Sequence, residues 1–232
     1  MSGVQSRITV IWKIIFLCVF CAVCNTAFSY LLNIQLKVPL FVDTIFTVAV
    51  CFTAGLLPGI LTGVLSPLAS FFRDSLLTGL PFEIGFSFFT ICILAEVLLV
   101  CFFHAKIKSQ EEVFLQKPSL NSFTGVATHL LVLVALDCIV VSVCGGTIDF
   151  ILGKFSAPLA SSFEDVFELG LLRNNVPVLA AAILSRIPIN IVDRFIAIFG
   201  GYGLSLLFRK IVSAKKRADR EFSQSARTIN GT

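Results

Sequence analysis

The sequence predicts an all-α integral membrane protein of six transmembrane helices with both termini cytoplasmic. Hydrophobic residues make up 56% of the 232 residues and charged residues 14%, with a mean hydropathy of +0.94, far from the composition of soluble domains. Apolar runs of bilayer length alternate with short polar segments along the chain. We expect residues 1–210 to form a single six-helix membrane domain and residues 211–232 a basic, polar cytoplasmic tail.

The first three expected helices lie in the most hydrophobic part of the chain. Residues 8–34 form one apolar run, too long for the core of a cleaved signal peptide. Residues 39–57 and 60–77 follow as a membrane hairpin that turns at Leu56-Leu57-Pro58-Gly59, with arms each about one bilayer long. Small residues around this corner allow the two backbones to approach closely.

The next two helices are separated by a polar stretch. We expect a fourth helix over 82–104, a solvent loop over 105–122 and a fifth helix over 125–151.

The last part of the chain begins with a segment of mixed polarity. Residues 153–175 alternate charged and apolar side chains, as an interfacial or re-entrant amphipathic segment does. Residues 176–208 form the last apolar run, which Pro188 interrupts. This run predicts either a kinked helix or a short helix followed by the spanning one.

Orientation follows from the positive-inside rule. Across six crossings, one side receives twelve basic residues: Arg7, Lys13, Lys106, Lys108, Lys117, Arg209, Lys210, Lys215, Lys216, Arg217, Arg220 and Arg227. The other side receives four: Lys37, Arg73, Lys154 and Arg173. The first side, which holds both termini, is therefore expected to be cytoplasmic, and the basic tail serves as a positive-inside signal rather than a nucleic-acid site.

Charged residues inside the last apolar run form a pattern. Arg186, Asn190, Asp193 and Arg194 recur at i, i+4, i+7 and i+8, so they share one helical face. Charges at membrane depth are costly and must meet protein or water. This face predicts either the polar wall of a ligand cavity or an internal ion pair that holds the helix against a neighbour.

Isolated polar residues occur in two other helices. For Glu96, His129 and Asp137, a hydrogen bond between helices is the favoured interpretation over contact with a ligand.

The sequence contains no catalytic, metal-binding or phosphate-binding constellation, so we expect neither an enzyme nor a cofactor or bound metal. It also contains no ATPase motif. Uphill transport would therefore need energy from a partner or from a coupled ion.

Two stretches carry a family resemblance. The hairpin segments 40–49 (LFVDTIFTVA) and 55–66 (GLLPGILTGVLS), with the closing segment 188–199 (PINIVDRFIAIF), resemble the S components of energy-coupling-factor (ECF) vitamin transporters. These proteins are the substrate-binding membrane subunits of bacterial importers. The resemblance covers most of the chain and agrees with six crossings and cytoplasmic termini.

The resemblance implies a subunit in the bacterial cell (inner) membrane that captures a vitamin or related precursor from outside. Its partners would be a transmembrane coupling subunit and ATPases, besides the lipid bilayer, with no nucleic acid. In the family a small-residue face of the first helix docks the coupling subunit, and here that face has only approximate small-residue pairs, formed by Cys18, Ala22 and Thr26.

The candidate substrate-binding residues combine the expected outer side with the polar face of the last helix. They are Asp43, Arg73, Asp74, Glu83, Arg173, Asn174, Asn175, Asn190, Asp193 and Arg194. The alternative is an orphan membrane sensor or scaffold domain that binds a ligand or a partner helix without transport. Sensor relatives continue into a signalling domain, whereas only a basic segment follows Phe208 here, which favours the transporter subunit.

The charge asymmetry generates a topological prediction. In a background without native cysteines, a cysteine at Ser109 should be shielded from an impermeant thiol reagent added outside, and one at Ser161 should react. The measurement is labelling of intact cells, with permeabilised cells as the control. Labelling of the Ser109 variant from outside would contradict the expected orientation.

Overall fold

A computed structural model describes residues 2–36, 40, 42–78, 88–116, 120–152 and 163–229. These residues contain helices and no strand, which confirms the all-α class. Five helices are long and apolar enough to cross a membrane, so the chain is a multi-pass membrane protein. The five candidate spans are Ile8–Tyr30, Leu56–Leu77, Thr90–Val113, Phe123–Ile151 and Val178–Ser213.

The first helix agrees closely with the sequence. Helix α1 covers Ser2–Tyr30 and continues into the π-helical segment η1, Leu31–Gln35. One face of α1 exposes large apolar side chains, among them Trp12 at 65% and Phe16 at 73% of their surface. An exposed apolar surface of this kind suits contact with lipid.

The expected first arm of the hairpin is wrong in length. Helix α2 covers only Ile45–Ala54, about 15 Å at the usual rise, and cannot cross a bilayer. Residues 42–44 are not helical, because the backbone there bonds to another helix: the Val42 N–H donates to Asp193 Oδ1 at 2.6 Å. Most of α2 is buried inside the bundle.

The turn between the arms also differs from the expected corner. Helix α3 covers Leu56–Thr78 and already includes Pro58 and Gly59 in its first turn, where proline is tolerated. The chain reverses at Gly55, whose φ of 88° favours glycine.

The expected solvent loop over 105–122 is wrong. Helix α5 covers Thr90–Gln116 and α6 covers Leu120–Ile151, so both helices run through this polar stretch. Part of this stretch belongs to the bundle: Ile107 is 1% exposed in the apolar core, and Glu111 pairs with Arg209 of α8 at 3.1 Å. The start of the expected helix 82–104, including Glu83, lies outside the described residues.

The last helices are longer than expected. Helix α7, Phe163–Arg173, is the amphipathic segment; residues 153–162 lie outside the described residues. Helix α8 runs from Val178 to Ile229 as one element with Pro188 inside it, so the alternative of a separate short helix is wrong. The expected tail over 211–232 is helical as far as Ile229.

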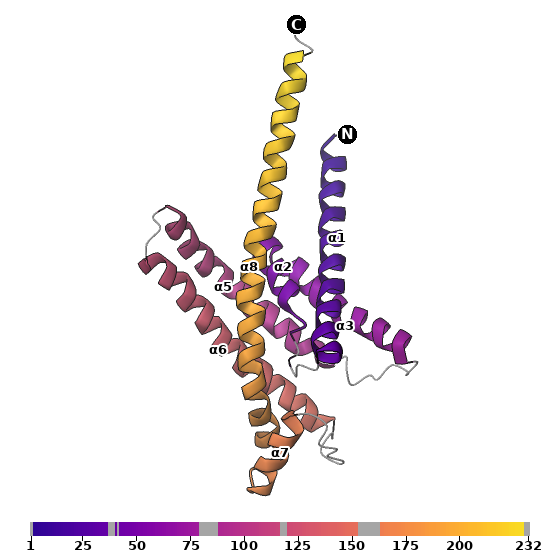
Figure 1. Ribbon diagram of the computed structural model, residues 1–232, viewed down its shortest axis with the longest axis vertical. Helices are drawn as coiled ribbons and strands as arrows, with labels where there is room; N and C mark the ends of the chain where they lie inside the picture. The colour runs from indigo at the N-terminus through magenta and orange to yellow at the C-terminus, as the bar shows by residue number, and fades with distance from the viewer. Residues whose placement is uncertain are drawn as a thin grey trace.

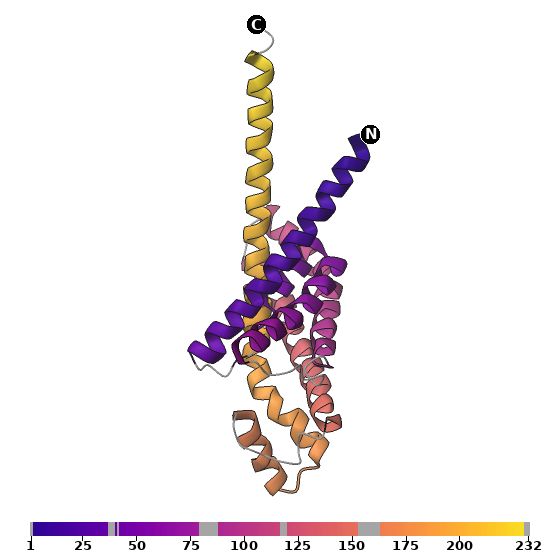
Figure 2. The same ribbon diagram turned by 90° about the vertical axis from the view of Figure 1, so that its right-hand side faces the viewer.

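Helix α8 is the axis of the bundle. It packs most extensively against α6 and α2, and α2 in turn contacts α1 and α3 (Figure 1). Both termini point to the same end of the molecule, whereas α7 lies at the opposite end (Figures 1 and 2).

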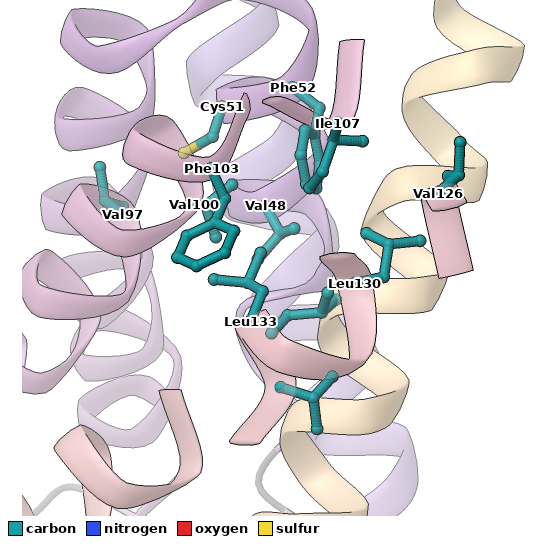
Figure 3. Packing of buried hydrophobic residues seen from close by; sticks show 12 residues of the cluster. Val48, Cys51, Phe52, Val97, Val100, Phe103, Ile107, Val126, Leu130 and Leu133 are labelled. Carbon is teal, nitrogen blue, oxygen red and sulfur yellow. The ribbon is translucent and has the colours of Figure 1, made fainter. Parts of the chain in front are cut away.

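The largest apolar core lies on one side of α2. Figure 3 shows Val48 and Phe52 of α2 meeting Val100 and Phe103 of α5 and Leu133 of α6. Burial of these side chains holds α2, α5 and α6 together on α8, which contributes Ile198 to the same core.

Two glycines allow α6 and α2 to approach α8 closely. A Cβ atom at Gly146 would lie 2.8 Å from the backbone of Ile183, and one at Gly201 would lie 2.6 Å from Val48. Real Cβ atoms do not approach so closely, so α6 and α2 lie at their present distance from α8 because these positions lack side chains.

We therefore expect Gly146→Ala to destabilise the protein by about 1–3 kcal/mol through overpacking of α6 against α8. The matched control is Gly203→Ala, where a Cβ atom meets nothing within 4 Å. Thermal unfolding in detergent would compare the two variants with the wild type. Equal melting temperatures for both variants would show that the close approach at Gly146 is not needed.

Candidate functional site

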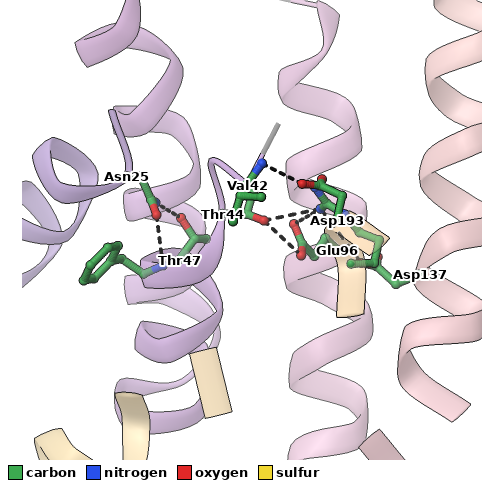
Figure 4. A network of polar contacts seen from close by, with 9 residues as sticks. Asn25, Val42, Thr44, Thr47, Glu96, Asp137 and Asp193 are labelled. Atoms are coloured by element: carbon green, nitrogen blue, oxygen red, sulfur yellow. Dashed lines mark hydrogen bonds and ion pairs between the residues drawn. The ribbon is translucent and has the colours of Figure 1, made fainter. Parts of the chain in front are cut away.

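A buried arginine on α8 binds carboxylates from two helices. Arg194 is 4% exposed, and its Nη1 donates to Glu96 Oε2 on α5 at 2.7 Å (Figure 4). Its Nη2 donates to the neighbouring carboxylate of Asp193. Glu96 and Asp193 are completely buried, so these ion pairs lie away from solvent.

The segment before α2 completes this network. Thr44 Oγ1 donates to Glu96 Oε1 at 3.2 Å and accepts from Arg194 Nη1 at 3.3 Å. The Val42 N–H donates to Asp193, as described above. The N-terminus of α2 therefore lies beside the carboxylates, where its helix dipole adds roughly half a positive charge.

Two further carboxylates face the same arginine. Asp137 on α6 is completely buried, and its Oδ2 lies 4.0 Å from Arg194 Nη1 (Figure 4). Neither oxygen of Asp137 accepts a hydrogen bond. Asp43, which is only partly buried, lies close enough to interact electrostatically with Arg194, Asp193 and Glu96. We call Asp43, Glu96, Asp137, Asp193 and Arg194 the buried charge cluster.

The charges of the buried charge cluster do not balance. One guanidinium faces four carboxyl groups, and only the partial charge of the α2 N-terminus supplements it. Burying ions in a low-dielectric region is costly even when they are paired, and an excess of one sign is more costly still. Such groups inside membrane segments are typically functional.

A line of polar contacts leads from this cluster along the α6–α8 interface. Asn190 of α8 donates to Ser142 Oγ of α6 at 2.8 Å. One turn further toward α7, Arg186 Nε donates to Asp149 Oδ2 of α6 at 2.9 Å. The sequence-predicted face of Arg186, Asn190, Asp193 and Arg194 thus contacts α6 and α5 rather than lipid.

Two acidic residues of α7 lie at the outer end of this polar line. The carboxyl groups of Glu164 and Glu168 interact with Arg186 and Asp149. Burial raises the pKa of both carboxyl groups above the usual value, and the positive charge of Arg186 opposes that shift. This end of the α6–α8 interface is therefore rich in acidic groups.

The structure brings together only part of the sequence-predicted site. Asp43, Asp193 and Arg194 belong to the buried charge cluster, and Asn190 lies next to it on α8. Arg73 instead pairs with Asp74 and donates to the Thr26 carbonyl of α1 at 3.1 Å. Arg173, Asn174 and Asn175 are exposed at the turn between α7 and α8. Glu83 lies outside the described residues.

The predicted docking face of α1 is an internal packing face. Cys18 is 0%, Ala22 2% and Thr26 7% exposed, and Thr26 bonds to Ser66 and Ser70 of α3. These three side chains are covered by α2 and α3, because small residues let α1 pack closely there. The exposed face of α1 is the one that carries Trp12 and Phe16.

Sequence analysis did not group Glu96 and Asp137 with Arg194. Glu96 does bond between helices, whereas Asp137 accepts no hydrogen bond, and His129 bonds to Gly125 on its own helix at 2.8 Å. Sequence analysis also passed over Thr44, which links Glu96 to Arg194. The available signal was that Glu96 and Asp137 each lie in the middle of a long apolar stretch, with the other acidic residues of these helices toward the helix ends.

Comparison with protein-family models, with curated proteins and with solved structures gives no match for this chain. Any function must therefore be argued from the sequence and from the buried charge cluster itself.

The ion pair between α5 and α8 should be strongly coupled. We expect Arg194→Met to destabilise the protein by roughly 3–5 kcal/mol, because it leaves Glu96 and Asp193 buried without a counter-charge. Adding Glu96→Gln should recover part of that loss, since it removes one of the stranded charges. Unfolding of the two single variants and the double variant in detergent gives the coupling free energy.

The control is the second ion pair between the same two helices, Glu111 with Arg209, which is partly exposed. Its coupling should be below about 1 kcal/mol. Additive effects of Glu96→Gln and Arg194→Met would show that the two residues do not stabilise each other.

Proposed function

We propose that this protein captures a small solute in the membrane and passes it to a separate ATP-driven partner for import. In this proposal it is the substrate-capture subunit of an ECF-type importer in the bacterial cell membrane, and the solute is vitamin-like. In this proposal the chain passes the membrane six times with both termini in the cytoplasm. Helix α2 alone is too short for a crossing, so the second passage includes the non-helical residues 42–44 as well as α2.

The observation that carries the proposal is the buried charge cluster. Three helices and the segment before α2 contribute polar groups to one point deep in the bundle, at a cost in stability that apolar residues would avoid. Ionisable groups gathered at membrane depth are the usual mark of a solute or ion site. The resemblance of segments 40–49, 55–66 and 188–199 to S components supports the same class.

The arrangement of the helices supports the orientation. The start of α1, the C-terminal part of α8, the end of α5 and the start of α6 all lie away from α7, and these parts of the chain carry most of the basic residues (Figure 1). The acidic groups of α7 lie at the other end, which in this proposal faces outward. Solute would therefore approach from the α7 end.

A membrane sensor or scaffold is the second candidate. It draws on one observation: α8 continues as a single helix well beyond the bundle (Figure 1). A continuous helix that contacts the buried charge cluster can transmit a small shift from that site to whatever it meets outside the membrane.

The test is a thermal-shift screen of the purified protein in detergent. We expect a vitamin-like solute to raise the melting temperature by mass action, in a screen that covers riboflavin, biotin, pantothenate, folates, pyridoxine, nucleobase precursors and amine-bearing relatives such as pyridoxamine. The shift should disappear in Arg194→Met and persist in Lys108→Met, a variant that loses an exposed positive charge at the opposite end. Affinity purification from native membranes should also recover an ATPase and a coupling subunit.

Absence of any stabilising solute, together with absence of a co-purifying ATPase, would refute the transporter proposal. A stabilising solute without any ATPase would favour the sensor.

A further inference from the structure

Asp137 is the member of the buried charge cluster that has neither a hydrogen-bond donor nor a close ion-pair partner among the described residues. Glu96 accepts from Arg194 at 2.7 Å and from Thr44, and Asp193 accepts from Arg194 and from the Val42 N–H. Among the described residues no donor group bonds to Asp137, although it is completely buried and lies 4.0 Å from Arg194 Nη1; its carboxyl group instead lies within hydrogen-bonding reach of the carboxyl group of Glu96. An ionised carboxylate with no hydrogen bond in such a place is strongly disfavoured.

In the part of the chain that the structure describes, the groups around Asp137 do not supply a second positive charge. The segment before α2 contributes Asp43, α5 contributes Glu96, and α8 contributes Asp193 together with Arg194. Arg194 is thus the one cation among these charged groups, and it already binds Glu96 and Asp193. Asp137 can lie here as a neutral carboxylic acid, or as a carboxylate once a further positive charge arrives.

Resting on the capture function proposed above, we propose that Asp137 holds a proton in the empty protein and that a cationic group of the solute takes its place. The exchange balances in charge: a neutral Asp137 carboxyl group and a protonated amine become a carboxylate–ammonium pair, and the carboxyl proton leaves to solvent. The solute class is therefore a small molecule that bears one amine or guanidine group.

A line of polar groups between α6 and α8 leads from the α7 end of the molecule to Asp137. It begins at Glu164 and Glu168 of α7, whose Oε1 atoms are buried and accept no hydrogen bond. It continues past the Arg186–Asp149 pair and the Asn190–Ser142 hydrogen bond to Asp137. Acidic groups at the entrance raise the local concentration of cations.

Arg186 lies on this polar line and is held against α6 by Asp149. Its guanidinium lies 5.3 Å from the ring centroid of Phe89, and a Cβ atom at Gly145 would lie 3.0 Å from its Nη1. The missing side chain at Gly145 gives Arg186 its place against α6. An arriving cation would compete with Arg186 for Asp149, then with the proton for Asp137.

The first test needs no solute. The infrared spectrum of the empty protein should contain the carbonyl stretch of a buried protonated carboxylic acid, and Asp137→Asn should lack it. The control Glu112→Gln removes an exposed carboxyl group at the far end of α5 and should retain the band. Asp137→Asn should also keep the melting temperature of the wild type, since an amide resembles a neutral acid. A wild-type spectrum without this band would overturn the proposal.

The second test uses matched solutes that differ in one charge. Pyridoxamine is compared with pyridoxine, arginine with citrulline, and putrescine with 1,4-butanediol. We expect one cationic member to raise the melting temperature, its neutral counterpart to leave it unchanged, and calorimetry in two buffers to show release of about one proton. Asp137→Asn should abolish the shift, and Glu112→Gln should retain it.

The outcomes separate this inference from the proposed function. A neutral or anionic solute that stabilises the protein, or a cationic one that still stabilises Asp137→Asn, would overturn the exchange at Asp137 and leave the capture function standing. If no solute of any charge has an effect, the capture function fails and the exchange fails with it, even when the infrared band is present.

Discussion

Arg194 lies at membrane depth in α8, so the charge of its guanidinium has to be balanced from inside the protein. Glu96 reaches it from α5 and Asp137 faces it from α6, while Thr44 approaches from the segment before α2. The relative rotation of these helices is constrained by this one group, since α5 must present Glu96 and α6 must present Asp137 toward α8. Helix α2 is short for the same reason, because the residues before Ile45 bond to α8 and α5 instead of extending the helix.

Close packing on either side of Arg194 keeps this arrangement in place. Gly146 lets α6 approach α8 on the α7 side of Arg194, and Gly201 lets α2 approach α8 on the C-terminal side. Neither position has a side chain that would hold the two helices apart. On the far side of α2, Asn25 of α1 donates to Thr47 and Ser66 and accepts from the Phe46 N–H. Asn25 thus caps α2 and ties α1 to α3, so the short helix is fixed from both sides.

Hydropathy predicted the membrane class and the approximate places of most spans, because a helix in lipid needs a long apolar run. Helical periodicity also placed Arg186, Asn190, Asp193 and Arg194 on one face correctly. The prediction failed where polarity was taken for a loop: Lys106, Lys108 and Glu111 are good helix formers, and α5 continues through them to pair with α8. It also failed for α2, since nothing in an apolar run shows that its backbone bonds to a distant helix.

The sequence could not predict that Glu96 and Asp137 lie beside Arg194, for a different reason. An apolar helix with one acidic residue has no visible face, so neither its rotation nor its neighbour can be derived from its own sequence. The predicted docking residues of α1 show a second limit. Cys18, Ala22 and Thr26 do share a face, but small side chains suit packing within the chain as well as packing on a partner.

Asn25 and Asp137 show how a structural polar group differs from a functional one. Both are buried in the bundle, and each comes from a helix that is otherwise apolar at that depth. Asn25 uses its amide nitrogen and its oxygen in hydrogen bonds that join three helices, so stability accounts for it. Asp137 receives no hydrogen bond from a donor group of the described residues, lies against the carboxyl group of Glu96, and faces an arginine that two other carboxylates already occupy. A structural ion pair needs one carboxylate for one guanidinium, and Glu96 alone would meet that need. The additional acid makes physical sense as a position prepared for a positive charge that enters and leaves.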